Sequence, residues 1–150
     1  MSTNPYASPA STSASTERTR EIRLYTPQHV GVATLLGGPL AGCLLMATNY
    51  RRMGKSDAAT VSVLFGLLAG VALAVIGITM PSVLSGFGPI VCIASIIVMR
   101  TLAQNTQGSA VEAHTRRGGK TDSAWNATGI GVVVLAAQCA ALFGFAMLVL

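Results

Sequence analysis

Charged and aromatic residues are scarce in this chain. Only 10% of its 150 residues are charged and 5% are aromatic, whereas 51% are hydrophobic. A chain with so little charge is not an ordinary soluble domain, and so many apolar residues exclude disorder along its whole length. It has neither a Gly-X-Y period nor a charged heptad, which excludes collagen-like and coiled-coil proteins. The composition therefore predicts a membrane protein.

Charged side chains are absent from three long stretches, residues 24–50, 58–99 and 123–150. A spanning helix needs about 20 apolar residues, so the first and last stretches hold one helix each and the middle one holds two. Met80-Pro81-Ser82 is the expected turn within the middle stretch. Thr26-Pro27 is the expected start of the first helix, since a hydroxyl cap is followed there by proline at the first helical position. We therefore predict an all-α integral membrane bundle of four transmembrane helices. The expected organisation is a disordered polar tail over 1–26, a transmembrane domain over 27–150 with spans at about 28–48, 58–80, 83–103 and 127–150, and a polar loop over 104–126.

The first apolar stretch contains Gly37-Gly38-Pro39, which permits two paths. We expect the first path, a kinked helix that spans the membrane, because spanning helices commonly tolerate proline. It places seven basic residues in the two loops that share one side, which the positive-inside rule makes cytoplasmic. The alternative is three spanning helices and one re-entrant hairpin broken at these residues, with all ten basic residues on the cytoplasmic side.

Residue patterns for catalysis or metal binding are also lacking. The three cysteines occupy three different apolar stretches without Cys-x-x-Cys spacing, and only His29 and His114 could join them as ligands. Neither histidine has a serine or cysteine partner that the sequence ties to it. The short basic segment 116–120 has neither the spacing of a phosphate-binding loop nor a nucleic-acid-binding fold around it. We expect no enzyme activity, no cofactor, no metal and no nucleic-acid partner.

Ionisable residues are absent from the middle of every predicted span, although ion-coupled carriers usually need one there. Gln138 is the only strongly polar residue deep in a span. We expect its amide to form a hydrogen bond across the bundle, and it is the candidate polar core of any solute path.

Small residues recur at intervals of four along the predicted helices, which lets helices approach closely. The predicted packing residues are Gly38, Gly42, Gly66, Gly70, Ala74, Ala136, Ala140 and Gly144. A second Gly-Pro pair, Gly88-Pro89, follows Gly38-Pro39 by 50 positions and is a second predicted helix break. Paired broken helices can mark the substrate site of a transporter.

Basic and amide side chains gather at the ends of the apolar stretches. Residues in these places suit contact with phospholipid headgroups or with a protein partner. The candidates are Asn49, Tyr50, Arg51, Arg52, Lys55, Arg116 and Arg117.

The segments Tyr25-Thr-Pro-Gln-His-Val-Gly-Val-Ala-Thr-Leu-Leu-Gly-Gly-Pro-Leu-Ala-Gly42 and Asn49-Tyr-Arg-Arg-Met-Gly-Lys55 resemble the opening of a group of small uncharacterised bacterial multi-spanning membrane proteins. The resemblance covers about a fifth of the chain, roughly residues 24–56. It implies a protein of the bacterial cytoplasmic (inner) membrane and carries no activity to transfer.

Two functions remain open from the sequence. The first is a non-catalytic accessory or interaction protein that acts through helix contacts with another membrane protein or with a second copy of itself, in the lipid bilayer. The alternative is a small transporter or channel component built around the broken helices and Gln138. A re-entrant first stretch would favour transport.

Overall fold

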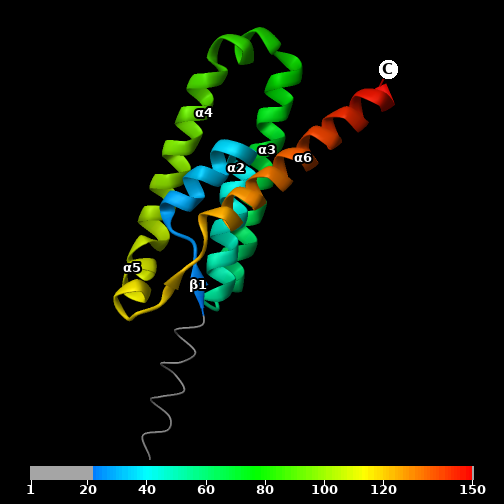
Figure 1. Ribbon diagram of the computed structural model, residues 1–150. Helices are drawn as coiled ribbons and strands as arrows, with labels where there is room; N and C mark the ends of the chain where they lie inside the picture. Colours follow the sequence, from blue (N-terminus) through cyan, green and yellow to red (C-terminus); the bar gives the residue numbers. More distant parts are fainter. Residues whose placement is uncertain (1–21, 150) are drawn as a thin grey trace, which may run out of the picture.

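The computed structural model describes residues 22–149, and the chain is all-α with four long apolar helices (Figure 1). Most of the predicted tail lies outside the described residues, but the predicted boundary at residue 26 is wrong, since β1 pairs with β2 and Leu24 and Tyr25 are buried. The elements in chain order are β1 Arg23–Leu24, α2 Pro27–Arg52, α3 Ser56–Thr79, α4 Pro81–Ala103, the π-helix η1 Gln104–Gly108, α5 Ser109–Arg116, β2 Lys120–Thr121 and α6 Ala124–Val149. The predicted fold class is confirmed, and helix bounds agree with the predicted spans to within a few residues.

Helix α2 is a hairpin of two helical arms, residues 27–36 and 39–52. Its backbone leaves helical geometry at Gly37 (φ −111°, ψ 16°) and Gly38 (φ 66°, ψ −168°). A straight helix of 26 residues would hold its ends about 39 Å apart. Instead, the Asn49 side chain forms two hydrogen bonds of 2.8 Å with the backbone of Tyr25. Helix α2 therefore folds back on itself, which is the backbone geometry that the re-entrant alternative requires.

Three residues make the reversal possible. The dihedral angles of Gly38 belong to a region that is essentially restricted to glycine. Pro39 follows as the first residue of the second arm, where its missing N–H costs no intrahelical hydrogen bond. The arms then pack at Gly42, where a Cβ would lie 3.4 Å from Val30 Cγ1. The hairpin is therefore closed by close contact as well as by hydrogen bonds.

Helix ends follow the local signals in two places. The Thr26 hydroxyl accepts the backbone N–H of His29 at 3.4 Å, and Pro27 opens the helix, as the sequence predicted. The predicted turn also occurs, since α3 ends at Thr79 and α4 begins at Pro81. The apolar residues between these signals are what places the helices in a membrane.

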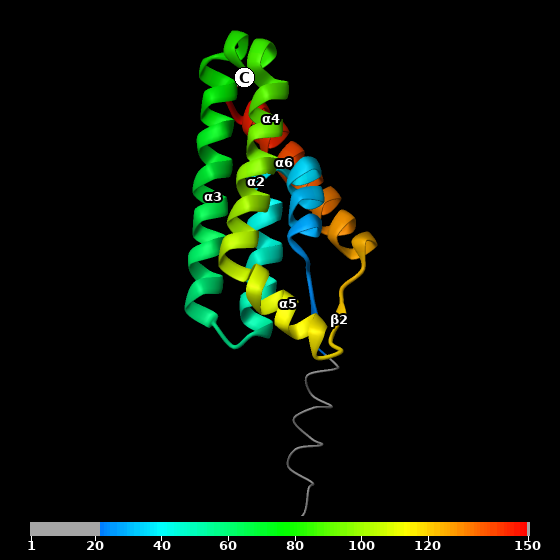
Figure 2. The same cartoon turned by 90° about the vertical axis from the view of Figure 1, so that its left-hand side faces the viewer.

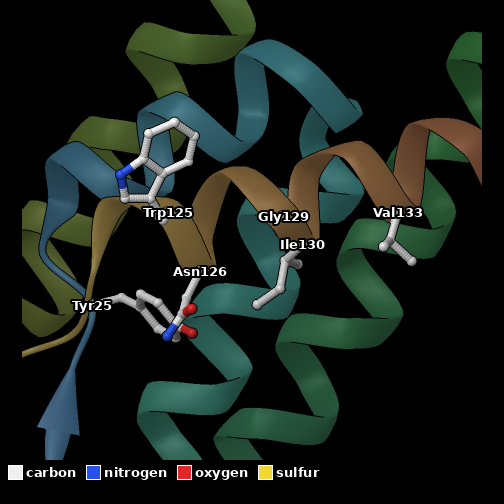
Figure 3. Close-up of a pocket in the computed structure, with 6 residues that line it drawn as sticks. All are labelled: Tyr25, Trp125, Asn126, Gly129, Ile130 and Val133. Atoms are coloured by element: carbon white, nitrogen blue, oxygen red, sulfur yellow. The ribbon is translucent and has the colours of Figure 1, made fainter.

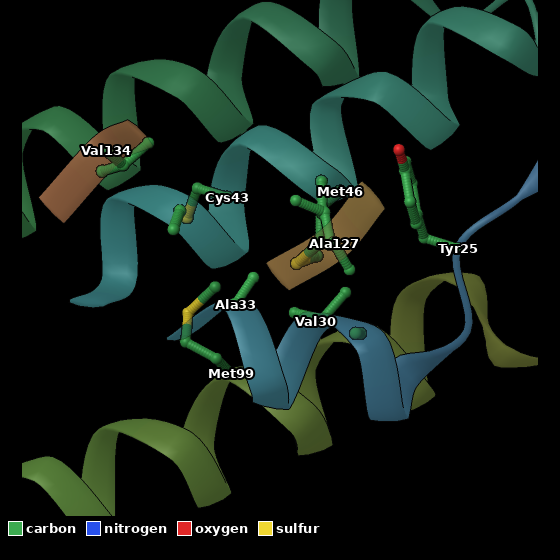
Figure 4. Close-up of a cluster of buried hydrophobic side chains, with 11 residues drawn as sticks. Tyr25, Val30, Ala33, Cys43, Met46, Met99, Ala127 and Val134 are labelled. Atoms are coloured by element: carbon green, nitrogen blue, oxygen red, sulfur yellow. The ribbon is translucent and has the colours of Figure 1, made fainter. Parts of the chain in front are cut away.

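The α2 hairpin occupies the centre of one half of the bundle (Figures 1 and 2). Its arms pack against α3, α4 and α6, and the buried core joins them to Met99 of α4 and to Ala127 and Val134 of α6 (Figure 4). In the most apolar window of α2, 61% of residues are buried, compared with 6% in α3 and 11% in α6. The apolar surface of α3, α4 and α6 faces outward, as a lipid environment requires.

The predicted polar segment 104–126 is largely helical, and its α5 covers residues 110–114, where the sequence also allows a short surface helix in place of a loop. Helix α4 continues through η1 into α5, which departs from the line of α4 (Figure 2). Gln107 of η1 is 1% exposed, and its Nε2 donates to the Met46 carbonyl at 3.0 Å. This buried anchor, 61 residues from Met46 in sequence, holds a polar segment in a helical conformation.

The second predicted break is absent from α4, which is described throughout as one helix. It passes through Gly88 and Pro89 without a non-helical residue. The same Gly-Pro pair breaks α2 because long-range contacts hold its arms together, whereas a Cβ at Gly88 would meet nothing within 4 Å. Membrane helices tolerate an interior proline.

We predict that Gly38→Ala destabilises the protein by about 1–3 kcal/mol, because alanine is strained at these dihedral angles. Gly88→Ala is the matched control, since it adds the same methyl group in a regular helix with open space around it. It should be neutral or slightly stabilising. Unfolding in mixed micelles by titration with sodium dodecyl sulfate measures both variants. Equal effects of the two substitutions would contradict the strained position of Gly38.

Candidate functional site

A cavity of about 930 Å³ lies beyond the tip of the hairpin, between α2, α3 and α6. Its floor is formed by Gly38, Pro39 and Leu40 at the helix break. Aliphatic and small residues of α3 and α6 form the walls, with Phe145 as the aromatic contribution. The predicted packing residues Gly70 and Ala74 belong to this lining. The cavity exists because the hairpin turns back and leaves the space above it unfilled.

Among the described residues, Gln138 is the only side chain with a hydrogen-bonding amide in the cavity lining. Its Nε2 donates to the Gly37 carbonyl oxygen at 3.4 Å, so it connects α6 to the helix break across 101 residues. The sequence predicted both a polar core at Gln138 and a break at Gly37, and the structure brings the two together. An amide at this position supplies the polar contact that an otherwise apolar site uses to orient a ligand.

The break and α6 approach each other through two glycines. A Cβ at Gly37 would lie 2.7 Å from the Gly131 carbonyl oxygen, and one at Gly131 would lie 3.0 Å from Leu36 Cβ. Such short distances allow no larger residue without movement of the backbone. Gly131 was missed in the sequence, although it lies four residues after buried Ala127 and three before buried Val134.

Apart from Gly38, Gly70 and Ala74, which line the cavity, the predicted small residues divide into two groups. Gly42 and Gly66 pack inside the chain, and a Cβ at Gly66 would lie only 2.6 Å from Cys43 Cβ. Three others, Ala136, Ala140 and Gly144, are exposed on α6, and a Cβ at Gly144 would meet nothing within 4 Å. Within the described residues, these three make no close helix contact.

A buried polar network, here called the clasp, joins the two ends of α2 to η1. Asn49 Oδ1 accepts the Tyr25 N–H, and Asn49 Nδ2 donates both to the Tyr25 carbonyl and to Gln107 Oε1, at 2.8–2.9 Å. Asn49 is 1% exposed, so its side chain is shielded from lipid and from any partner. This corrects its predicted role as a contact residue. Its side-chain amide accepts from and donates to the backbone of Tyr25, as a neighbouring β-strand would, so the role of Asn49 is structural.

An ion pair extends the clasp to the start of α6. Arg52 Nη1 donates to Asp122 Oδ2 at 2.8 Å and also to the Arg23 carbonyl, and its guanidinium lies 5.2 Å from the Tyr25 ring centroid. Burial raises the pKa of the Asp122 carboxyl. Hydrogen bonds from Arg52, Asn126 and the Ser123 backbone outweigh burial and lower the pKa to about 2. Asp122 therefore stays ionised and keeps this pair intact at neutral pH.

The other predicted contact residues remain on the surface. Arg51, Lys55 and Arg117 are exposed, and Tyr50 is half-buried. Arg116 is exposed and pairs with Glu112 one helical turn earlier, at 2.6 Å. An exposed pair of this kind adds little stability, so Arg116 stays available to a second anion.

Positive charge is concentrated at one end of the described chain. Seven of the eight basic residues among residues 22–149 belong to β1, the end of α2, the α2–α3 connection and the segment from α5 to β2, which lie at the end opposite the Met80–Pro81 turn (Figures 1 and 2). The eighth, Arg100, lies in the last turn of α4, where its Cβ is 3.9 Å from a Cβ built at Gly31. The eight are Arg23, Arg51, Arg52, Lys55, Arg100, Arg116, Arg117 and Lys120. The hairpin is what brings Arg23 to the same end as Arg51 and Arg52.

A smaller hollow of about 440 Å³ lies where the clasp meets α6 (Figure 3). It is lined by Tyr25, Trp125, Asn126, Gly129, Ile130 and Val133. Trp125 is 83% exposed and projects from the first turn of α6. An exposed indole at the end of a long apolar helix is typical of the position that tryptophan favours at a membrane surface.

Comparison with protein-family models, with curated proteins and with solved structures finds no match for this chain. Among the described residues, His, Cys, Asp and Glu form no group of three that could hold a metal ion. The fold alone defines the class: four long apolar helices and an outward apolar surface make this a multi-pass membrane protein.

We predict that Asn49→Leu lowers the free energy of unfolding by about 2–4 kcal/mol. The substitution removes three hydrogen bonds and leaves buried backbone and amide groups of Tyr25 and Gln107 without partners. Asn105→Leu is the matched control, because Asn105 is exposed on η1. Titration with sodium dodecyl sulfate measures the difference. A loss below 1 kcal/mol for Asn49→Leu would mean that the clasp does not hold the hairpin.

Proposed function

We propose that this protein is a small transporter or channel component that passes an uncharged solute along the cavity at the hairpin tip. The observation that carries the proposal is the position of the helix break. The hairpin ends inside the bundle beside a cavity large enough for a small molecule, and Gln138 provides the polar contact there. Irregular backbone inside a membrane is typical of sites where it lines a cavity.

The electrostatics favour an uncharged solute. All lining residues of the cavity are uncharged, and seven of the eight basic residues of the described chain lie at one end of the bundle. Moving an ion into such a site without a counter-charge has a desolvation cost far larger than the stabilisation from hydrogen bonds to one amide. A neutral solute avoids this cost, and the break supplies backbone dipoles for it.

The charge distribution supports an orientation and a membrane. Both ends of α2 lie on the basic side, so α3, α4 and α6 are the three crossing helices. The positive-inside rule then places the clasp in the cytoplasm and the Met80–Pro81 turn outside. Together with the resemblance of residues 24–56 to bacterial membrane proteins, this supports the bacterial cytoplasmic (inner) membrane. The proposal requires no catalysis, cofactor or nucleic acid.

A second function is favoured by a separate observation. In the half of the bundle beyond the hairpin tip, residues 22–149 provide no fourth helix beside α3, α4 and α6, and α6 turns Ala136, Ala140 and Gly144 outward. Small outward residues let a foreign helix approach closely. These features suit an accessory protein that binds another membrane protein, and equally a transporter that assembles from several copies. Purification with a stoichiometric partner and without solute flux would favour the accessory function.

Uptake into proteoliposomes tests the transport proposal. We expect at least one of a series of radiolabelled uncharged solutes, from glycerol to trace octyl glucoside, to enter at least tenfold faster than in protein-free vesicles. Potassium and chloride should not enter faster. Gln138→Leu should lower the solute rate at least tenfold, because it removes the polar contact at the break.

Gln104→Leu is the matched control for this experiment. It makes the same substitution at an exposed position of η1, on the opposite side of the hairpin from the cavity, and should keep the rate within twofold. Ion flux, or equal rates for the Gln138 and Gln104 variants, would reject the proposed route.

A further inference from the structure

The Gln138 amide has unused hydrogen-bonding capacity. A carboxamide offers two N–H donors and a carbonyl oxygen with two acceptor positions. Its one hydrogen bond in the described structure is the donation from Nε2 to Gly37, at the long distance of 3.4 Å. Gln138 Oε1 accepts no hydrogen bond from the described residues. A hydrogen-bond acceptor without a donor in apolar surroundings is unfavourable. A ligand that donates a hydrogen bond to Gln138 Oε1 removes this cost and therefore binds more tightly.

The rest of the cavity selects for an apolar body. Side chains such as Leu67 and Val71 of α3, and Leu142 and Phe145 of α6, form its walls around the break. Its volume of about 930 Å³ exceeds what one hydroxyl-sized group needs and is within the range of small-molecule sites. An anionic amphiphile would find no positive side chain in the lining, since Gln138 is the only strongly polar residue there.

We propose that the cavity binds an uncharged amphiphile, in which a hydroxyl or amide N–H donates to Gln138 Oε1 and an aliphatic or cyclic body fills the space between α3 and α6. This inference rests on the proposed function and narrows its uncharged solute to one chemical class. The donor group lies at the helix break, and the apolar body extends away from the hairpin. Ordinary lipid chains lack a donor at this depth and bind less well than the alcohol.

Photolabelling in lipid nanodiscs tests the site directly. The probe is a twelve-carbon alcohol with a diazirine on its chain, and labelled peptides are located by mass spectrometry. We expect labelling of α3 and α6 at the cavity. Dodecanol should displace the probe at concentrations at least tenfold lower than 1-methoxydodecane, which lacks the donor, or dodecanoate, which is charged.

Two variants with matched controls test the Gln138 amide and the open volume of the cavity. Gln138→Leu should remove the tenfold preference for dodecanol, while Gln104→Leu keeps it. Gly70→Leu should lower cavity labelling at least fivefold by filling the space beside the amide, because a Cβ there has only ordinary contacts, 3.9 Å from Leu40 Cβ and 4.0 Å from Gln138 Nε2. Gly86→Leu adds the same side chain to open space on α4 and should leave labelling unchanged. Helical circular dichroism and monodisperse elution establish that each variant is folded.

The outcomes distinguish this inference from the transport proposal. Equal competition by dodecanol and 1-methoxydodecane, or labelling spread evenly over the lipid-facing helices, overturns the amphiphile site even if solute flux is observed. The expected labelling without any solute flux keeps the site and rejects transport.

Discussion

The structure depends on the pairing of the Asn49 side chain with the backbone of Tyr25. These residues are 24 positions apart, at opposite ends of α2, and their two hydrogen bonds can form only if the helix reverses. Tyr25 is buried, so its backbone groups need such partners because water does not reach them. The same amide reaches Gln107 and so fixes η1 as well. One buried side chain therefore joins three segments of the chain.

The reversal determines what the rest of the bundle can be. The first arm has ten residues and is about 15 Å long, half of the hydrocarbon thickness of about 30 Å. The hairpin fills one half of the bundle, and α3, α4 and α6 cross the remaining depth with little support from their own chain. The cavity, the exposed small residues of α6 and the single basic end all follow from this arrangement. Solute handling and assembly with other helices both make use of the unfilled half.

Much of the architecture could be predicted because charges and helix signals act locally. The gaps between charged residues predicted four apolar helices, Pro81 predicted the turn, and Thr26-Pro27 predicted the start of α2. Gly37-Gly38-Pro39 also predicted where α2 could break. The sequence could not determine whether it breaks, because Gly88-Pro89 offers similar local freedom and α4 remains continuous. The decision lies in contacts between distant residues.

The errors at the polar end have the same origin. Asn49 precedes a run of basic residues and has the sequence context of a surface anchor, yet it is buried because Tyr25 and Gln107 surround it. Residues 104–116 are polar enough for a loop, and η1 and α5 form because Gln107 has a buried partner. Gln138 was identified correctly as a polar residue inside the bundle because an amide is conspicuous in a long apolar run. Its partner, the Gly37 carbonyl, has no signature in the sequence.

The side of the membrane on which α2 begins and ends is the most direct test of this account. Single cysteines at positions 23, 55 and 82, in a background in which Cys43, Cys92 and Cys139 are alanine, can be labelled with a membrane-impermeant maleimide in sealed vesicles of both orientations. The account predicts that positions 23 and 55 react from one side and position 82 from the other. Reaction of positions 23 and 82 from the same side, opposite to 55, would show that α2 crosses the membrane and would contradict the hairpin.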